Sequence, residues 1–358
     1  MVALRGFDSV MKPSTKTLFI VMLIFHLSFY LSGLLMGKTV FNFAGDANTD
    51  GIIYYLIARA PFAEPPIDNG FRYATFLYPL LTSLIARGDA FLTAVVMELI
   101  NIVAFSLSIA IFYRLSKDDG FPLATVFYAF NPILLISTHG GMNEPLYFAL
   151  VFGALLAFRL DRFIPSTILL SLAVLSRPDF VIFILPFFAI AKRRRFLPYL
   201  TVVFLTIAGF GYYLMSRFGL QHFTSFARGV DSGLPPMLGI PFYTFFQNRF
   251  FGATGTPQIL GSNLLLNEFI TWTIFIGLIL SVLIMIRKRE FDGLSLSLIV
   301  LGSIIQPAYS YFSGYFRFIS MTPYLYRLPP LLLKGRILLI VAILYMIGGI
   351  SLLVAWFY

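Results

Sequence analysis

Long runs of hydrophobic residues recur along the whole chain, separated by short polar segments. The runs are continuous rather than alternating, which favours membrane-spanning α-helices and excludes a transmembrane β-barrel. The pattern predicts about eleven transmembrane or half-spanning helices. They cover residues 17–36, 90–113, 121–138, 146–160, 163–176, 179–191, 196–215, 264–286, 294–312, 318–333 and 337–357.

Composition agrees with this pattern. Of the 358 residues, 59% are hydrophobic, and the mean hydropathy is +0.87. A soluble domain has roughly 45–50% apolar residues. The chain contains no cysteine, which excludes disulfides and thiolate metal sites, and its three histidines are scattered without forming a ligand cluster. We therefore expect an all-α polytopic membrane protein, with residues 1–358 forming one integral-membrane domain.

The segment 73–88 is hydrophobic but short, and Pro79 interrupts it. Positive charge indicates whether it crosses the membrane, because cytoplasmic loops are enriched in lysine and arginine. In one topology the N-terminus is cytoplasmic, 17–36 is a retained first span, and 73–88 does not cross the membrane. Most of the 26 basic residues then lie inside. These are Arg5, Lys12, Lys16, Arg114, Lys117, Arg159, Arg162, Lys192, Arg193, Arg194, Arg195, Arg287, Lys288, Arg289, Lys334 and Arg336. We therefore expect 73–88 to be re-entrant or interfacial and buried against protein. In this interpretation the net charge of +10 comes mainly from basic residues in cytoplasmic loops, and no nucleic-acid partner is expected.

Two further segments are unusual. Segments 163–176 and 179–191 are each short for a span, and they are predicted to meet at a break below the outer surface. The long outer loop, about 216–263, is rich in aromatic residues, glycine and proline, so we expect it to be functional rather than disordered.

On this topology, acidic residues and arginines gather on the outer side. A carboxylate there could act as a general base on a hydroxyl, and an arginine could hold a phosphate. The outer first loop, about 37–89, contains Asp46, Asp50 and Arg72. Later segments add Glu144 after a glycine pair, Arg177 at the predicted break, and Arg317.

Four ordered patches resemble integral-membrane glycosyltransferases of the GT-C superfamily. They are TDGIIYYLIAR with FRYATFLYPLLTSLIA, then FNPILLISTHGGMNEPLYFAL, then LSLAVLSRPDF, and then GYFRFISMTPYLY. Within that superfamily the chain resembles the GPI mannosyltransferase 2 type and prokaryotic dolichyl-phosphate-mannose transferase-like proteins. The resemblance spans residues 46–325 and implies a GT-C-type fold.

The resemblance implies transfer of a sugar, such as mannose or another hexose, from a polyprenyl-phosphate carrier to a lipid or glycan acceptor, with inversion. It gives Asp50 or Asp46 the role of catalytic base, and it makes Glu144 an orienting catalytic residue. Arg177, Arg72 and Arg317 would bind the phosphate, and Tyr54, Tyr55 and Tyr78 could stack on sugar. The partners would be the lipid-linked donor, the acceptor and membrane lipids.

Each of these residues also has a structural explanation. Asp50 could cap a helix, and Glu144 could be a first-turn acid. Arg177 could pair with Asp179 or Asp50, Arg72 could snorkel, and Arg317 could make a cation–π contact. The three tyrosines could belong to an interfacial aromatic belt.

A cofactor is not firmly expected, although Asp46 and Asp50 could share Mg²⁺ or Mn²⁺, which prefer oxygen ligands. The alternatives to an enzyme are a transporter or lipid flippase, or a non-catalytic subunit of a glycan-assembly complex. The location would be the cell membrane of a prokaryote, with the site facing outside, or the endoplasmic reticulum membrane of a eukaryote.

Overall fold

The computed structural model describes residues 13–36, 50–62, 75–118, 120, 122–177, 185–218, 326 and 328–357. These residues form helices and turns with no strand, which confirms the all-α prediction for this part of the chain. The helices are α2 (Thr15–Leu35), α4 (Asp50–Arg59), α6 (Leu77–Ala86), α7 (Ala90–Asp118), α8 (Ala124–Ala129), α9 (Pro132–His139), α10 (Glu144–Arg159), α11 (Phe163–Ser176), α13 (Leu185–Phe218), α19 (Leu328–Leu332) and α20 (Gly335–Phe357).

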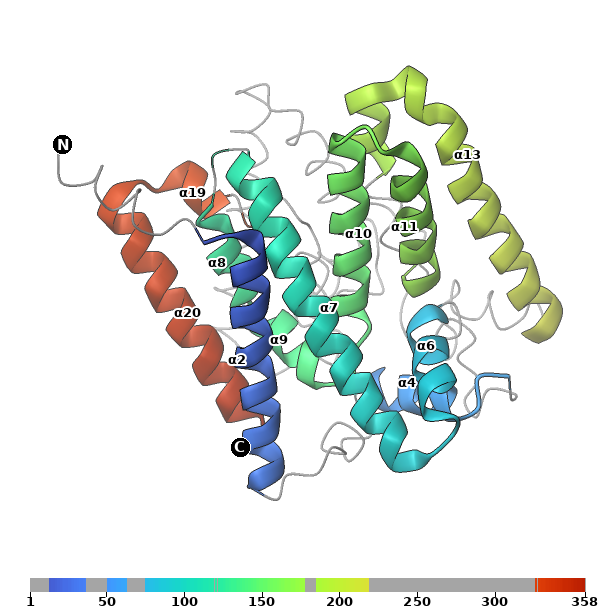
Figure 1. The fold of residues 1–358 in the computed structure, drawn as a ribbon, viewed down its shortest axis with the longest axis horizontal. Coiled ribbons are helices and arrows are strands. Elements are labelled where there is room, and N and C mark those ends of the chain that lie inside the picture. Colours follow the sequence, from blue (N-terminus) through green and yellow to red (C-terminus); the bar gives the residue numbers. More distant parts are fainter. Residues whose placement is uncertain are drawn as a thin grey trace, which may run out of the picture.

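The helices run between two ends of a bundle (Figure 1). In that view α2, α11 and α20 descend, while α7 and α10 rise. The start of α7 and the short helices α4 and α6 lie toward the lower end, and the start of α10 and the end of α11 face them from above. The upper end holds the start of α2, the end of α7 and the turn from α10 to α11.

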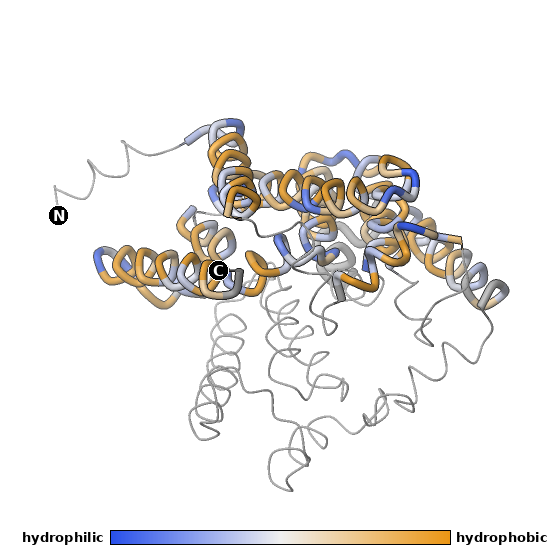
Figure 2. Tube along the Cα trace, turned by 90° about the horizontal axis from the view of Figure 1, so that it is seen from below, coloured by the Kyte–Doolittle hydropathy of each residue, from blue (hydrophilic) through white to orange (hydrophobic). Residues whose placement is uncertain are grey.

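Within the described ranges, α2, α7 and α20 are long and apolar enough to cross a membrane. They match the predicted spans 17–36, 90–113 and 337–357, and Figure 2 shows hydrophobic residues along most of α20. The pair α9 and α10, bent by 114°, would make a fourth crossing if it is one broken span. Several apolar helices thus support an integral membrane protein. The predicted segments 264–286 and 294–312 lie outside the described residues, as does most of 318–333.

The predicted span over 121–138 is not one continuous helix. The chain passes from the upper to the lower end through two short helices, α8 and α9 (Figure 1). Asn131 causes the break, because its side chain accepts hydrogen bonds from the backbone nitrogens of Ile133 and Leu134 and so begins a new helix. Pro132 occupies the first helical position, where its missing N–H costs nothing.

The predicted segments 179–191 and 196–215 are not separate helices, because α13 is continuous from Leu185 to Phe218. Figure 1 shows that this helix rises to the upper end, bends and descends again. Pro198 lies inside the helix, where proline removes a backbone hydrogen bond and favours a kink. The long outer loop predicted for 216–263 lies outside the described residues after position 218.

The segment 73–88 contains the short helix α6. Its 10 residues span about 15 Å, half of a bilayer core of about 30 Å. Leu77, Tyr78, Pro79 and Thr82 are buried on one side of it, and α6 packs against α4 and α7. A short helix buried against protein agrees with the predicted re-entrant or interfacial segment.

An aromatic core holds the centre of the bundle. Phe105 and Phe112 of α7 contact Tyr128 of α8, with ring centroids 5.5 and 5.0 Å apart. Phe148 and Phe152 of α10 contact the same tyrosine ring. The hydroxyl of Tyr128 lies 2.6 Å from that of Ser108, so the polar end of this buried ring is hydrogen-bonded. The core fixes α7, α8 and α10 and thereby the residues at the lower end of the bundle.

Candidate functional site

A buried ion pair joins the start of α10 to the end of α11. The Nη1 atom of Arg177 donates to Oε1 of Glu144 at 2.6 Å and to Oδ1 of Asn143 at 3.2 Å. Asn143 in turn donates to the backbone oxygen of Ser176 at 2.9 Å. Glu144 is 0% exposed and Arg177 is 5% exposed. The structure thus brings together two residues that the sequence named separately, and Glu144 is one partner of Arg177. The predicted pairing of Arg177 with Asp179 or Asp50 involves side chains outside the described part of the chain.

The two helices favour the charges at this place. Glu144 begins α10, where the positive end of the helix dipole favours a carboxylate. Arg177 follows the last residue of α11, where the negative end favours a cation. A glycine-containing turn comes just before Asn143, and Gly141 has a φ of +66°, a conformation that glycine adopts without strain. The cluster formed by Asn143, Glu144, Ser176 and Arg177 is called the α10–α11 clamp below.

The three candidate tyrosines form a second buried cluster, beside the clamp. Tyr54 and Tyr55 lie on α4, Tyr78 lies on α6, and all three pack with Ala94 and Met97 of α7. Leu146, two residues beyond Glu144, packs against the same cluster. Because the tyrosines are buried between helices, the prediction of a lipid-facing aromatic belt is wrong for them.

Hydrogen bonds satisfy two of these tyrosines. Tyr78 donates to the backbone oxygen of Met97 at 3.1 Å, and Tyr55 donates to that of Ala90 at 3.3 Å. The rings of Tyr54 and Tyr78 meet edge to face, with centroids 6.1 Å apart. Burial, followed by the nearby Glu98 carboxyl, raises the pKa of Tyr78 well above its usual value. Tyr78 is therefore a neutral donor that fixes α6 on α7.

The other candidates have a partial or no structural description. Asp50 is the first residue of α4, and the helix lies at the lower end with α6. Nothing is described for its side chain. Asp46, Arg72 and Arg317 lie outside the described residues, as does most of the predicted catalytic loop 37–89. Within the described ranges, no three histidine or acidic side chains are grouped closely enough to hold a metal ion. The shared metal of Asp46 and Asp50 remains a prediction.

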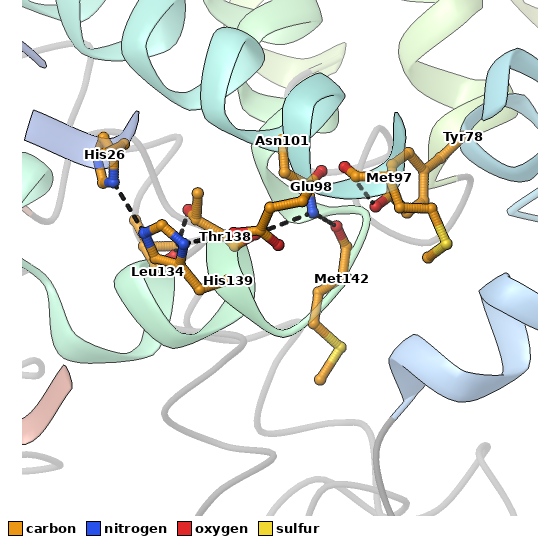
Figure 3. A network of polar contacts seen from close by, with 9 residues as sticks. All are labelled: His26, Tyr78, Met97, Glu98, Asn101, Leu134, Thr138, His139 and Met142. Atoms are coloured by element: carbon orange, nitrogen blue, oxygen red, sulfur yellow. Dashed lines mark hydrogen bonds and ion pairs between the residues drawn. The ribbon is translucent and has the colours of Figure 1, made fainter. Parts of the chain in front are cut away.

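Sequence reasoning missed a polar chain inside the bundle, shown in Figure 3. Glu98 of α7 lies 2.5 Å from Nδ1 of His139 in α9, and Nε2 of His139 lies 3.1 Å from Nδ1 of His26 in α2. Asn101, one turn after Glu98, donates to the backbone oxygens of Thr138 and Met142. An acid in the middle of a predicted span was the available signal, because such residues are rare and functional.

A groove lined only by apolar residues and glycine lies beside the tyrosine cluster. It has a volume of about 600 Å³ and lies between α6, α7, α10 and α11. Its wall follows α7 from Val96 to Ile111, about 22 Å of helix. Leu146 and Leu150 of α10 and Leu169 of α11 line the opposite side. The groove therefore passes close to the α10–α11 clamp through Leu146.

The described site thus combines a buried acid–arginine pair, a tyrosine cluster and an apolar groove at one end of a helical bundle. These features suit a ligand with a charged head and a hydrocarbon tail. In the comparisons with known proteins, no family model, no curated protein and no solved structure matches this chain.

Proposed function

We propose that this protein is an integral-membrane glycosyltransferase. It would move a hexose, such as mannose, from a polyprenyl-phosphate carrier to a lipid or glycan acceptor on the outer face of the membrane. The observation that carries the proposal is the buried α10–α11 clamp beside an apolar groove. A lipid-linked sugar has a phosphate that an arginine binds and a hydrocarbon tail that an apolar groove covers.

The clamp supports a role in positioning charge. A buried arginine and glutamate within hydrogen-bond distance hold each other in one orientation, which is the preorganisation that phosphate stabilisation requires. In this proposal Arg177 meets the phosphate charge while Glu144 holds its guanidinium in place. Arg72 and Arg317 are the further phosphate-binding candidates.

The groove supports a lipid carrier rather than a soluble nucleotide sugar. Its 600 Å³ are walled by side chains such as Leu99, Val103 and Leu107, which offer no hydrogen bond to a polar ligand. An isoprenoid chain gains free energy by leaving water for such a surface. The groove lies between helices that are apolar along their length, so a carrier could enter it from the bilayer.

The proposed reaction is a single displacement. The carboxylate of Asp50, or of Asp46, takes the proton of the acceptor hydroxyl. The hydroxyl oxygen attacks the anomeric carbon, and the bond from that carbon to the phosphate oxygen breaks. Polyprenyl phosphate leaves with the electron pair, and the anomeric centre is inverted. Glu144 orients the base or the acceptor.

The test is sugar transfer by the purified protein in liposomes with a panel of synthetic polyprenyl-phosphate sugars. Divalent metal is present in one arm and chelated in the other. Wild type is compared with Asp50→Asn and Asp46→Asn, and with Asp118→Asn as a control at the opposite, exposed end of α7. We expect transfer by wild type and the control, and loss with Asp50→Asn. Loss of transfer with Asp46→Asn alone would identify Asp46, four residues before Asp50, as the base. Absence of transfer by folded wild type, with every donor and acceptor class, would overturn the proposal.

A second candidate function is a transporter or lipid flippase. The observation that favours it is the chain of Glu98, His139 and His26, because buried acid and histidine chains carry protons in pumps and transporters. Liposomes loaded with a fluorescent polyprenyl-phosphate sugar distinguish the two functions. A flippase moves the intact analogue between leaflets, whereas the proposed enzyme cleaves its sugar only when an acceptor is present.

A further inference from the structure

Three ionisable side chains from three helices form one continuous chain (Figure 3). The carboxyl group of Glu98 faces Nδ1 of His139, and when that carboxyl is ionised it accepts a hydrogen bond, so that the nitrogen carries the hydrogen. The other ring nitrogen of His139 faces Nδ1 of His26, so one of these two atoms donates and the other accepts. The position of a single proton therefore depends on all three residues together.

The chain of Glu98, His139 and His26 lies in an apolar part of the bundle. Its three members are at most 4% exposed. The rings of Phe25 and Phe105 pack edge-on against His26, and Phe29 packs against His139. Among the described residues no group bonds the buried Nε2 atom of His26, which is the end of the chain. Water and lipid do not surround these three side chains, so a net charge on them is not stabilised by solvent.

Two protonation states of Glu98, His139 and His26, which differ by one proton, are compatible with the geometry. In the first, both imidazoles are neutral, His26 donates to His139, and the Glu98 carboxylate leaves the chain with one negative charge. In the second, a proton has bound at Nε2 of His26, and the Nδ1 proton of His26 has passed to Nε2 of His139. His139 is then an imidazolium paired with the carboxylate, and the chain is neutral. A lone buried carboxylate is far more costly than a hydrogen-bonded pair.

We propose that Glu98, His139 and His26 form a proton-binding site inside the helix bundle, in which one exchangeable proton makes His139 an imidazolium between the carboxylate and the second imidazole. This inference does not depend on the proposed transferase activity. Other titratable groups face the site from the neighbouring helices. Tyr30 of α2 and Tyr78 of α6 both interact electrostatically with the Glu98 carboxyl, and Glu144 of α10 interacts electrostatically with Tyr78. They are neutral tyrosines and an acid already paired with Arg177, so none of them replaces Glu98 as the counter-charge.

The site is connected to the α10–α11 clamp through the turn after α9. His139 is the last residue of α9, and Asn101 donates to the backbone oxygen of Met142 at 2.8 Å, one residue before Asn143. Loss of the proton converts the ion pair between α7 and the end of α9 into a weaker hydrogen bond from a neutral imidazole. The turn that carries Asn143 and Glu144 is therefore expected to respond to proton release.

The experiment uses the full chain, labelled with ¹⁵N-histidine and ¹³C-methyl methionine, in lipid nanodiscs. Only three histidines contribute signals, and His222→Gln identifies the third. Nitrogen NMR reports directly whether each ring nitrogen carries a hydrogen. Spectra are recorded from about pH 5 to about pH 9, the range around the ordinary pKa of histidine. Met142→Leu identifies the methionine signal from the turn.

Near neutral pH we expect two protonated ring nitrogens on His139 and one on His26. As the pH rises, both rings change with a single midpoint, and the Met142 methyl signal shifts with them. In Glu98→Gln, His139 loses its second ring hydrogen at neutral pH because the imidazolium has no counter-charge. Ser106→Ala, which changes another buried polar side chain of α7, leaves the histidine spectrum as in wild type.

The proposal is overturned if His139 of wild type has one bare ring nitrogen at about pH 6 and keeps the same spectrum in Glu98→Gln. It is equally overturned if the two histidines titrate with separate midpoints. The wild-type spectrum decides the matter even if Glu98→Gln does not fold. A constant Met142 signal across the midpoint would overturn the connection to the turn.

Discussion

At the scale of single residues, the ion pair of Glu144 and Arg177 is the group whose loss has the clearest consequence. Both side chains are buried, and each compensates in part for the desolvation of the other. Removing one partner leaves a buried charge, whereas removing both leaves a smaller defect. The pair therefore contributes to stability as a unit, whatever its role with substrate.

Arg177→Met is expected to lower the free energy of unfolding by about 3–5 kcal/mol, since it leaves the Glu144 carboxylate buried without its cation. The double variant Glu144→Leu with Arg177→Met is expected to lose less free energy of unfolding than the two single variants lose together. Thermal unfolding in nanodiscs measures both. Arg114→Met, at an exposed position of α7, is the control and should change little. Additive losses would show that the two side chains do not interact.

The sequence identified Glu144 and Arg177 as charged residues at helix ends, because a proline directly follows each of them. It did not identify their pairing, which depends on the antiparallel contact of α10 with α11. The same limit explains the missed network. Glu98, His139 and His26 are far apart in the sequence, and only the packing of α2, α7 and α9 brings them together.

At the scale of helices, the contact between α20 and the short helices α8 and α9 depends on a glycine. A Cβ atom at Gly349 would collide with the backbone oxygen of Phe130, whereas the neighbouring Gly348 has nothing within 4 Å of such an atom. Small residues allow membrane helices to approach closely, and here one of two adjacent glycines has that role. The carbonyl of Phe130 lies at the break between α8 and α9.

Gly349→Ala is expected to be less stable than Gly348→Ala by about 1–3 kcal/mol, because α20 must move away from Phe130. Both substitutions raise the helix propensity of α20 by the same amount, so the difference between them isolates the contact. Thermal unfolding of the two variants side by side makes the measurement. Equal midpoints would mean that α20 does not pack on Phe130.

Helix positions followed from the sequence where hydrophobic runs were long and uninterrupted. The runs at 17–36, 90–113 and 163–176 correspond closely to α2, α7 and α11. The run at 121–138 was misread because hydropathy does not register Asn131–Pro132 as the start of a new helix. The basic cluster before Pro198 was read as a loop, but a continuous bent helix places the same residues in α13.

At the scale of the whole molecule, the two ends of the bundle differ in charge. The upper end of Figure 1 contains Lys16 at the start of α2, Lys117 at the end of α7, Arg162 before α11 and Arg336 at the start of α20. The lower end contains the α10–α11 clamp and the start of α4 at Asp50. The positive-inside rule therefore predicts that the upper end faces the cytoplasm and that the candidate site faces the other side.

Single cysteines test this orientation, because the natural chain has none. Arg87→Cys, three residues before α7, and Asp118→Cys, its last residue, place exposed thiols at opposite ends of α7, whose 29 residues extend about 43 Å. A membrane-impermeant thiol reagent should label Arg87→Cys in intact cells and Asp118→Cys only after permeabilisation. The opposite pattern would reverse the orientation, and it would place the candidate site with cytoplasmic substrates.

The apolar groove also has a consequence for handling the protein. A recess of about 600 Å³ walled by aliphatic side chains accommodates an alkyl chain of a solubilising detergent as readily as a natural tail. If the groove holds the lipid tail in the proposed transferase, long-chain detergents are expected to compete with the lipid-linked donor. The critical micelle concentration and chain length of the detergent then become variables of every transfer assay. Activity measured after extraction should rise when the detergent is exchanged for a polymer-bounded bilayer, even though the fold is unchanged.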